Sequence, residues 1–478
     1  MLGALAALAI GGTAQAQTVI EITGATAFRS AAVTAINAAF NAGGNFTYAY
    51  ANTDKVGTAT TLTSGSMQIW RGTFPGIGDT IIRTSWNGSV EGIRAVAVPG
   101  VANNPLYLKT TTLPGTLVAG GGTPNTFRFH SDPNGDGAAA NALNYEPAES
   151  DMSFSDVAQS ATPVSGLSLT GGPVGVVVFT MIANKTWSDD KIAGGAYGTR
   201  LPSNITDQQF RTMAKNGYVP MSFFTGDVND TLRVYLTGRN DGSGTRTSYL
   251  SETGFGASKP VVQYLGHDRS STTTIPIIVK VPAGGGFNFQ DVAKPEYAST
   301  VWGLDQDGNG GHVSSGDVKA DLSKTTASTA VWEFTDLDES GTFEANEDAQ
   351  VRPAEKLYMI SWVTYDDARS ARGTGLASAR TAEVLGYNGV ILPSLSGDNP
   401  PTNMSVADRA LVAEGKYTPW NFQQLYYVAS RTGAAAAFTE IKSRLNDETL
   451  IGKAGMPIGQ MHVNRTTDGG IINPGAPN

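Results

Sequence analysis

Short apolar runs, each followed by a turn and an amphipathic stretch, recur along the chain. Residues 19–22 predict a strand, and a helix with apolar positions at helical spacing follows the turn at 23–26. Residues 81–86 repeat this unit, and residues 232–236 begin it again before the loop at 239–245. Strands that alternate with helices in this way indicate an α/β fold.

Two further elements have strong local signals. The apolar run at 175–179 predicts a buried strand. A helix is predicted over 206–216, because Thr206 and Gln209 have the spacing of a capping box and Gly217 follows as a stop signal.

Turn-rich segments divide the chain into parts. We predict a first lobe over 17–180 with an insertion over 98–148, and a second lobe over 181–416 with an insertion over 262–350. Residues 417–478 are predicted to return to the first lobe. Two α/β lobes joined by crossing strands leave a place for a ligand between them.

The first residues have features of an export signal. An apolar run from Leu2 to Ile10 is followed by Ala14-Gln15-Ala16, which has the small-x-small pattern of a cleavage site. We therefore expect residues 1–16 to be a signal peptide and the protein to be periplasmic or extracellular, the alternative being a buried N-terminal helix or strand. No later stretch reaches the roughly 18 apolar residues of a transmembrane segment.

Composition narrows the function classes. The formal net charge is −9 and no Lys/Arg cluster interrupts the acidic balance, so no nucleic acid partner is expected. The absence of cysteine excludes disulfides, thiolate metal sites and thiol nucleophiles. The four histidines are scattered without ligand spacing, which gives no support for a histidine metal site or a Ser-His-Asp triad.

The loop at 239–245 has the composition of an anion site. Gly244 lets a ligand approach the backbone, Ser243 and Thr245 can donate through hydroxyl and amide groups, and Arg239 can offer a bidentate fork that Asp241 would orient. The alternative is an ordinary Ser-capped helix start with a surface arginine.

This loop, Arg239-Asn240-Asp241-Gly242-Ser243-Gly244-Thr245, resembles the R-x-D-x-S-G-T signature of the PstS-like phosphate-binding proteins. Segments 22–28, 88–93 and 151–156 resemble other family motifs in the same order, and residues 414–417 resemble the family's G-K-Y-P return. The resemblance implies a two-lobed periplasmic-binding-protein fold of type II and inorganic phosphate as the ligand.

The resemblance also implies roles for further residues. Phe28 matches a residue that donates its amide, whereas the family's Thr position falls on Ala27 and the hydroxyl stands one residue earlier at Thr26. Ser89 matches a hydroxyl donor at the next helix start. Asp156 matches the carboxylate that accepts the proton of phosphate, which would exclude sulfate because sulfate carries no proton near neutral pH.

A second candidate site is independent of this resemblance. Residues 336–347 fit the twelve-residue calcium loop, with an apolar residue at position eight and these predicted ligands: Asp336, Asp338, Ser340, Thr342, Glu344 and Glu347. Bound Ca²⁺ would have a structural role, and no other cofactor is required. The alternative is an acidic surface loop.

Three function classes remain at this stage. The leading one is an exported receptor, not an enzyme, that captures phosphate between two lobes for ATP-driven uptake through a membrane permease. The second is an extracellular structural or matrix protein that keeps the fold and binds calcium. The third, a phosphatase, requires a nucleophile or metal pair that the sequence does not offer.

Overall fold

The computed structural model describes most of the chain after residue 16. The described residues are 17–53, 61–129, 144–193, 197–267, 277–280, 287–289, 301–302, 311–312, 315–323, 330–334, 342–343, 349–353, 356–375 and 380–477. The predicted signal peptide therefore lies outside them. Within these residues no helix is long and apolar enough to cross a membrane.

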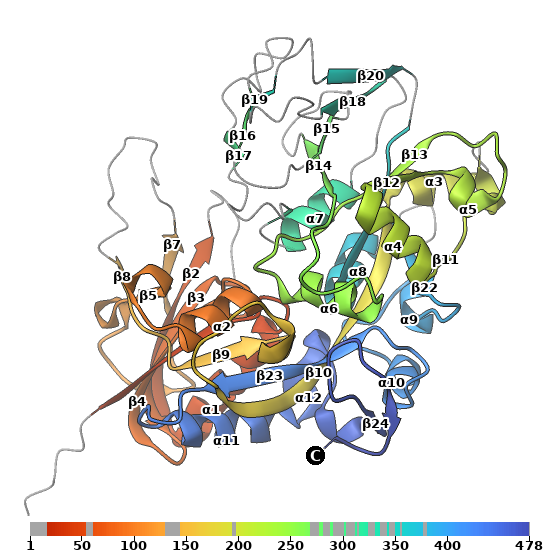
Figure 1. Ribbon diagram of the computed structural model, residues 1–478. Helices are drawn as coiled ribbons and strands as arrows, with labels where there is room; N and C mark the ends of the chain where they lie inside the picture. Colours follow the sequence, from red (N-terminus) through yellow and green to blue (C-terminus); the bar gives the residue numbers. More distant parts are fainter. Residues whose placement is uncertain are drawn as a thin grey trace, which may run out of the picture.

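A mixed sheet of 14 strands forms the centre of the described structure (Figure 1). Its strands are β1 (Thr18–Gly24), β2 (Asn45–Thr53), β3 (Met67–Phe74), β4 (Gly78–Ser85), β6 (Val118–Ala119), β7 (Asn125–Phe129), β9 (Met152–Ser155), β10 (Thr170–Asn184), β11 (Asn204–Ile205), β12 (Tyr218–Pro220), β13 (Arg233–Leu236), β21 (Tyr358–Thr364), β22 (Ala382–Tyr387) and β23 (Trp420–Tyr427). The α/β class expected from the sequence is confirmed.

Helices pack on this sheet and on the segments that leave it. They are α1 (Arg29–Gly43), α2 (Ser89–Ala97), α3 (Lys185–Ala193), α4 (Asp207–Asn216), α5 (Ser222–Thr225), α6 (Gly244–Glu252), α7 (Ser315–Leu322), α8 (Tyr365–Arg372), α9 (Pro393–Ser396), α10 (Val406–Ala413), α11 (Ala434–Leu445) and α12 (Glu448–Ile451).

The long strand β10 divides the sheet into two parts. Its first part, Thr170–Val178, pairs antiparallel with β23, and its second part, from Phe179, pairs antiparallel with β21 and β22. We call the part with β1 to β4 and β9 the first lobe, and the part with β13, β21 and β22 the second lobe. Figure 1 shows β10 running from one lobe into the other.

In the first lobe, β1 pairs parallel with β4 and with β9. The strands β1 and β4 each begin one of the strand-turn-helix units predicted from the sequence. The helix α1 packs on β3 and α11, whereas α2 packs on β1 and β9. Phe40 lies in the core of the first lobe, with its ring centroid 5.2 Å from that of Phe74 and 6.4 Å from that of Trp70. Each of these side chains is fully buried.

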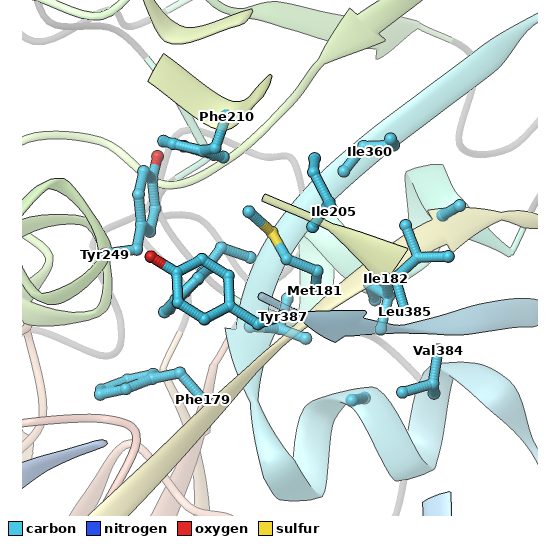
Figure 2. Close-up of a cluster of buried hydrophobic side chains, with 14 of the residues drawn as sticks. Phe179, Met181, Ile182, Ile205, Phe210, Tyr249, Ile360, Val384, Leu385 and Tyr387 are labelled. Carbon is cyan, nitrogen blue, oxygen red and sulfur yellow. The ribbon is translucent and has the colours of Figure 1, made fainter. Parts of the chain in front are cut away.

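The second lobe has its own aromatic and aliphatic core (Figure 2). Tyr249 of α6 lies with its ring 4.9 Å from Phe210 of α4 and 5.5 Å from Trp362 of β21. These contacts fix the position of α6, which begins at the loop predicted to bind an anion. The core of this lobe therefore holds a site element in place.

Two local predictions from the sequence are confirmed. The apolar run at 175–179 lies within β10. The helix α4 begins after Thr206, whose hydroxyl accepts from the amide of Gln209 while the Gln209 side chain accepts from the amide of Thr206. Gly217 ends the helix in the left-handed conformation with φ 79°.

The turn-rich insertions form smaller sheets beside the main one. These contain β5 (Leu106–Leu108) with β8 (Tyr145–Pro147), β14 (Tyr264–His267) with β15 (Ile277–Lys280), β18 (Ala330–Phe334) and β20 (Ala349–Pro353), and β16 (Phe287–Phe289) with β17 (Val301–Trp302) and β19 (Thr342–Phe343); a last pair is β24 (Val463–Asn464) with β25 (Asn473–Pro474). The helix α7, which lies within the second insertion, packs on α8 and β21 of the second lobe.

The predicted calcium loop cannot be compared with the structure. Of its predicted ligands, Thr342 belongs to β19, and its side chain is not among those described. The other five residues lie outside the described residues: Asp336, Asp338, Ser340, Glu344 and Glu347.

Candidate anion-binding site

Two glycine-rich loops, one from each lobe, meet where α2 and α6 begin. The amide of Gly88 donates to the carbonyl of Gly24 at 3.0 Å, and the amide of Val90 donates to the carbonyl of Gly242 at 3.3 Å. Gly88 has φ 117°, which favours glycine, and a Cβ there would lie 2.7 Å from the Gly242 oxygen. The N-termini of two helices thus face a common region.

Asp156 lies at this junction, just after β9. Its side chain is buried, with 1% of the residue exposed. One carboxylate oxygen accepts from the hydroxyl of Ser89, the first residue of α2, and the other accepts from the hydroxyl of Thr245 in α6 at 3.4 Å. The carboxylate is therefore held by hydroxyl donors from both lobes.

The backbone of Asp156 is fixed from the opposite side. Its carbonyl accepts from Asn421 Nδ2 at 3.1 Å and from Ser248 Oγ at 3.4 Å. Asn421 Nδ2 also donates to Ser248 Oγ at 2.9 Å. Asn421 belongs to β23 and Ser248 to α6, so β23 and the second lobe both position Asp156.

Gly244, the first residue of α6, permits the close approach of Asp156. A Cβ at this position would lie 1.7 Å from Asp156 Oδ1 and 2.5 Å from Ser89 Oγ. Only a residue without a side chain fits there. The requirement for glycine comes from contact with the other lobe, since the backbone of Gly244 does not have a positive φ.

Burial controls the charge state of Asp156. Burial raises the pKa of this carboxyl, while hydrogen bonds from Ser89 and Thr245 and the charge of Arg239 lower it in part. The net direction is upward, towards the protonated form. A carboxylate with a raised pKa is a strong hydrogen-bond acceptor, so it can accept the proton of a protonated oxyanion instead of repelling that ligand.

Arg239 is buried beside this junction, and the second insertion supplies its contacts. Its Nε donates to the His312 carbonyl at 3.1 Å and its Nη1 donates to Ser315 Oγ at 2.8 Å. The His312 amide donates in turn to Gly238 at 2.9 Å. Asp241 Oδ1 is buried without a hydrogen-bond partner among the described residues, so this oxygen does not orient the guanidinium.

The backbone of Ser243 closes the turn at the start of α6, whereas its hydroxyl does not take part in that turn. Its amide donates to the Asn240 carbonyl at 3.2 Å, which closes the turn, and its carbonyl accepts the amide of Thr247. The Ser243 side chain makes no cap hydrogen bond. Its hydroxyl, in place of its amide, is therefore the group that remains for a ligand.

The start of α1 lies next to the same region through the pairing of β1 with β9, where Gly24 is opposite Phe154. Within the described structure, the amides of Ala27 and Phe28 make no hydrogen bond to another backbone group. The Phe28 ring is buried against that of Phe154 at 6.2 Å. Thr26 and Ala27 are half-buried.

The structure thus brings Ser89, Asp156, Gly244 and Thr245 into direct contact, with Arg239 and Ser243 adjoining them. It describes no direct contact between Asp156 and the α1 start. Sequence reasoning missed four residues that hold the site in shape: Ser248, His312, Ser315 and Asn421.

Together, the fold and the site define a two-lobed α/β protein in which helix N-termini from both lobes converge on one buried carboxylate. No family model and no curated protein matches the chain. Solved structures similar to it include three that are described as phosphate-binding or phosphate-transport proteins or as PstS.

The first is a protein described as a phosphate ABC transporter substrate-binding protein with bound phosphate, from Clostridium perfringens; identity is 10%, the TM-score 0.37, and coverage 90% of this chain and 94% of that one. An ABC-type phosphate transport receptor from Vibrio cholerae has 9% identity, a TM-score of 0.35, and coverage of 91% and 95%. PstS from Borrelia burgdorferi has 10% identity, a TM-score of 0.32, and coverage of 90% and 94%. These values are too low to assign a function by similarity.

Proposed function

We propose that this protein is an exported receptor that captures inorganic phosphate between its two lobes, for uptake through an ATP-driven membrane permease. The observation that carries the proposal is Asp156, a buried carboxyl held by Ser89 of one lobe and Thr245 of the other. Support also comes from Arg239, which is buried beside it.

The donors and the acceptor together favour a protonated oxyanion. Helix N-termini with hydroxyl side chains stabilise negative charge. Asp156 adds an acceptor, whose burial-raised pKa favours sharing a proton with the ligand. Monohydrogen phosphate can donate to this carboxyl, whereas sulfate cannot, and this difference is the proposed basis of selectivity.

Ligand binding in this proposal changes the arrangement of the lobes without changing covalent bonds. Hydroxyl donors come from both lobes, so a bound anion stabilises the arrangement in which they face each other. The strand β10 extends along both parts of the sheet and is the proposed hinge, with β23 paired to its first part. The proposed role is therefore binding and not catalysis.

Titration calorimetry on protein refolded in phosphate-free buffer tests the proposal. We expect phosphate to bind with micromolar or tighter affinity and sulfate to give little heat. Asp156→Asn should weaken phosphate binding about tenfold or more and allow sulfate to bind, because the amide can donate to an unprotonated oxygen.

Asp79→Asn, a change at an exposed position on β4, is the matched control and should leave both titrations unaltered. A preference for sulfate in the wild-type protein, or no heat with either anion, would refute the proposed function.

A further inference from the structure

A cluster of basic side chains gathers where the start of α1 faces the second lobe. One member, Arg29, is the first residue of α1. The others come from α7, α8 and the short helix η8 (Gly452–Ala454) that follows α12: Lys319, Arg369 and Lys453. Both lobes and the C-terminal return therefore contribute to this basic cluster.

Two adjacent carboxylates at the start of α8 neutralise part of the cluster. Lys319 pairs with Asp367 at 3.0 Å. Arg369 and Lys453 both pair with Asp366, at 2.8 Å and 2.9 Å. Two cations thus share one carboxylate, and the basic side chains outnumber the acidic ones.

Arg29 is the member that adds charge without a bonded partner. Among the described residues its guanidinium makes no hydrogen bond and no ion pair, although the side chain is half-buried. Burial lowers its pKa and the charge of Asp367 opposes that change. Lys319 lies close enough for its own pKa to be lowered in part by Arg29. A partly desolvated guanidinium without a bonded counter-charge gains more from pairing with an anion than a fully solvated one does.

The cluster borders the candidate phosphate site. Burial acts to raise the pKa of Asp367, yet the charges of Lys319 and Arg239 and a hydrogen bond from Thr364 hold it below its ordinary value. Arg239 is also within electrostatic range of Asp156. Arg29 directly follows Phe28, whose amide is a predicted phosphate donor. The excess positive charge thus continues from the phosphate site towards α7 and α8.

This excess is local, since the whole chain carries a formal charge of −9. One phosphate group held by Asp156, Ser89 and Thr245 leaves Arg29 without a counter-charge.

We propose that the site accepts phosphate ligands with a second phosphate group, inorganic pyrophosphate being the simplest, and that Arg29 binds the second group. This inference rests on the proposed function, because the first phosphate group occupies the site at Asp156. Lys319 supplies additional charge while Asp367 keeps its ammonium in place.

The test compares orthophosphate with pyrophosphate by calorimetry, in wild-type protein and in Arg29→Met. Wild-type protein should bind pyrophosphate at least as tightly as orthophosphate. Arg29→Met should weaken pyrophosphate binding tenfold or more, as expected for loss of a hydrogen bond between charged groups, and should change orthophosphate binding by less than about threefold.

Two further variants test whether the charge at position 29 is responsible for any change in affinity. Arg29→Lys retains the charge and should recover part of the pyrophosphate affinity. Arg71→Met removes an exposed arginine on β3 and should alter neither affinity. Thermal melts of each variant confirm that the protein is folded before the titrations.

The outcomes separate this inference from the proposed function. Binding of orthophosphate without pyrophosphate overturns only the inference. An equal loss of both affinities in Arg29→Met also overturns it, because Arg29 would then act on lobe closure or on the first phosphate group. An absence of heat with both ligands in wild-type protein refutes the proposed function itself.

Discussion

Replacing Gly244 with alanine adds a single methyl group at the contact between the lobes. That group would lie 1.7 Å from Asp156 Oδ1, and a separation of 3.0 Å requires the carboxylate to move by about 1.3 Å. Ser89 Oγ, at 2.5 Å from the same point, blocks part of that movement. The carboxylate must therefore leave its hydrogen bonds to Ser89 and Thr245.

The size of the effect follows from these contacts. A hydrogen bond to a charged group contributes about 1.5–3 kcal/mol, and two such bonds are disturbed. Alanine is favoured over glycine in helices by up to about 1 kcal/mol, which offsets part of the loss. We expect a net loss of about 2–5 kcal/mol in phosphate binding, or roughly 30- to 5,000-fold in Kd.

Calorimetry with phosphate measures this loss, and Gly172→Ala is the matched control. Gly172 lies in β10 with no atom within 4 Å of an added Cβ, so its replacement should leave the phosphate Kd unchanged. A Gly244→Ala protein that binds phosphate within about threefold of wild type would show that Asp156 and α6 do not meet as described.

Other predictions concern stability. Arg465→Met should destabilise the protein by about 3–5 kcal/mol, because it leaves the Glu252 carboxylate buried and unpaired. Lys416→Met removes one side of an exposed ion pair and should cost under about 1 kcal/mol. Equal urea midpoints for the two variants would contradict this difference. Burial raises the pKa of Asp468 to about 6, so the folded state holds this proton more tightly than the unfolded state does. The free energy of unfolding should therefore fall as pH rises from about 4 to about 6. Asp468→Asn should reduce this dependence on pH in urea titrations. Phe40→Ala should cost about 3–5 kcal/mol in the same assay, since the ring is fully buried among aromatic neighbours, and a cost under about 1 kcal/mol would show that it does not pack as described.

Features encoded within a few residues could be predicted from the sequence. The capping box at Thr206 and Gln209 and the stop at Gly217 depend only on neighbours along the chain, and α4 has these bounds and caps. The strand at 175–179 was also predictable, because its apolar run is long enough to require burial on both faces. The full length of β10 was not, because its two parts pair with different strands.

The candidate site was predictable in part. Ser89, Asp156, Gly244 and Thr245 stand in recognisable motifs, and they meet in the structure. His312 and Ser315 had no such signal, because they lie more than 70 residues after Arg239 and contact it only through folding of the insertion. The contact of Asn421 with Asp156 spans an even longer separation.

The basic cluster shows a different limit. Its members stand alone in the sequence and have no shared motif, so no pattern of charge could reveal them. They meet because α7 from the second insertion and η8 from the C-terminal return pack near α8.

The pairing of β23 with β9 and β10 has a consequence for how the protein is made. Residues 424–427 fill the gap in the first lobe between a strand at 152–155 and the beginning of β10. Most of the polypeptide must therefore leave the ribosome before this lobe can complete its sheet, and closing so large a loop slows folding. A fragment ending before residue 420 should leave one edge of β9 and of the first part of β10 without its partner β23, and should aggregate through these exposed edges.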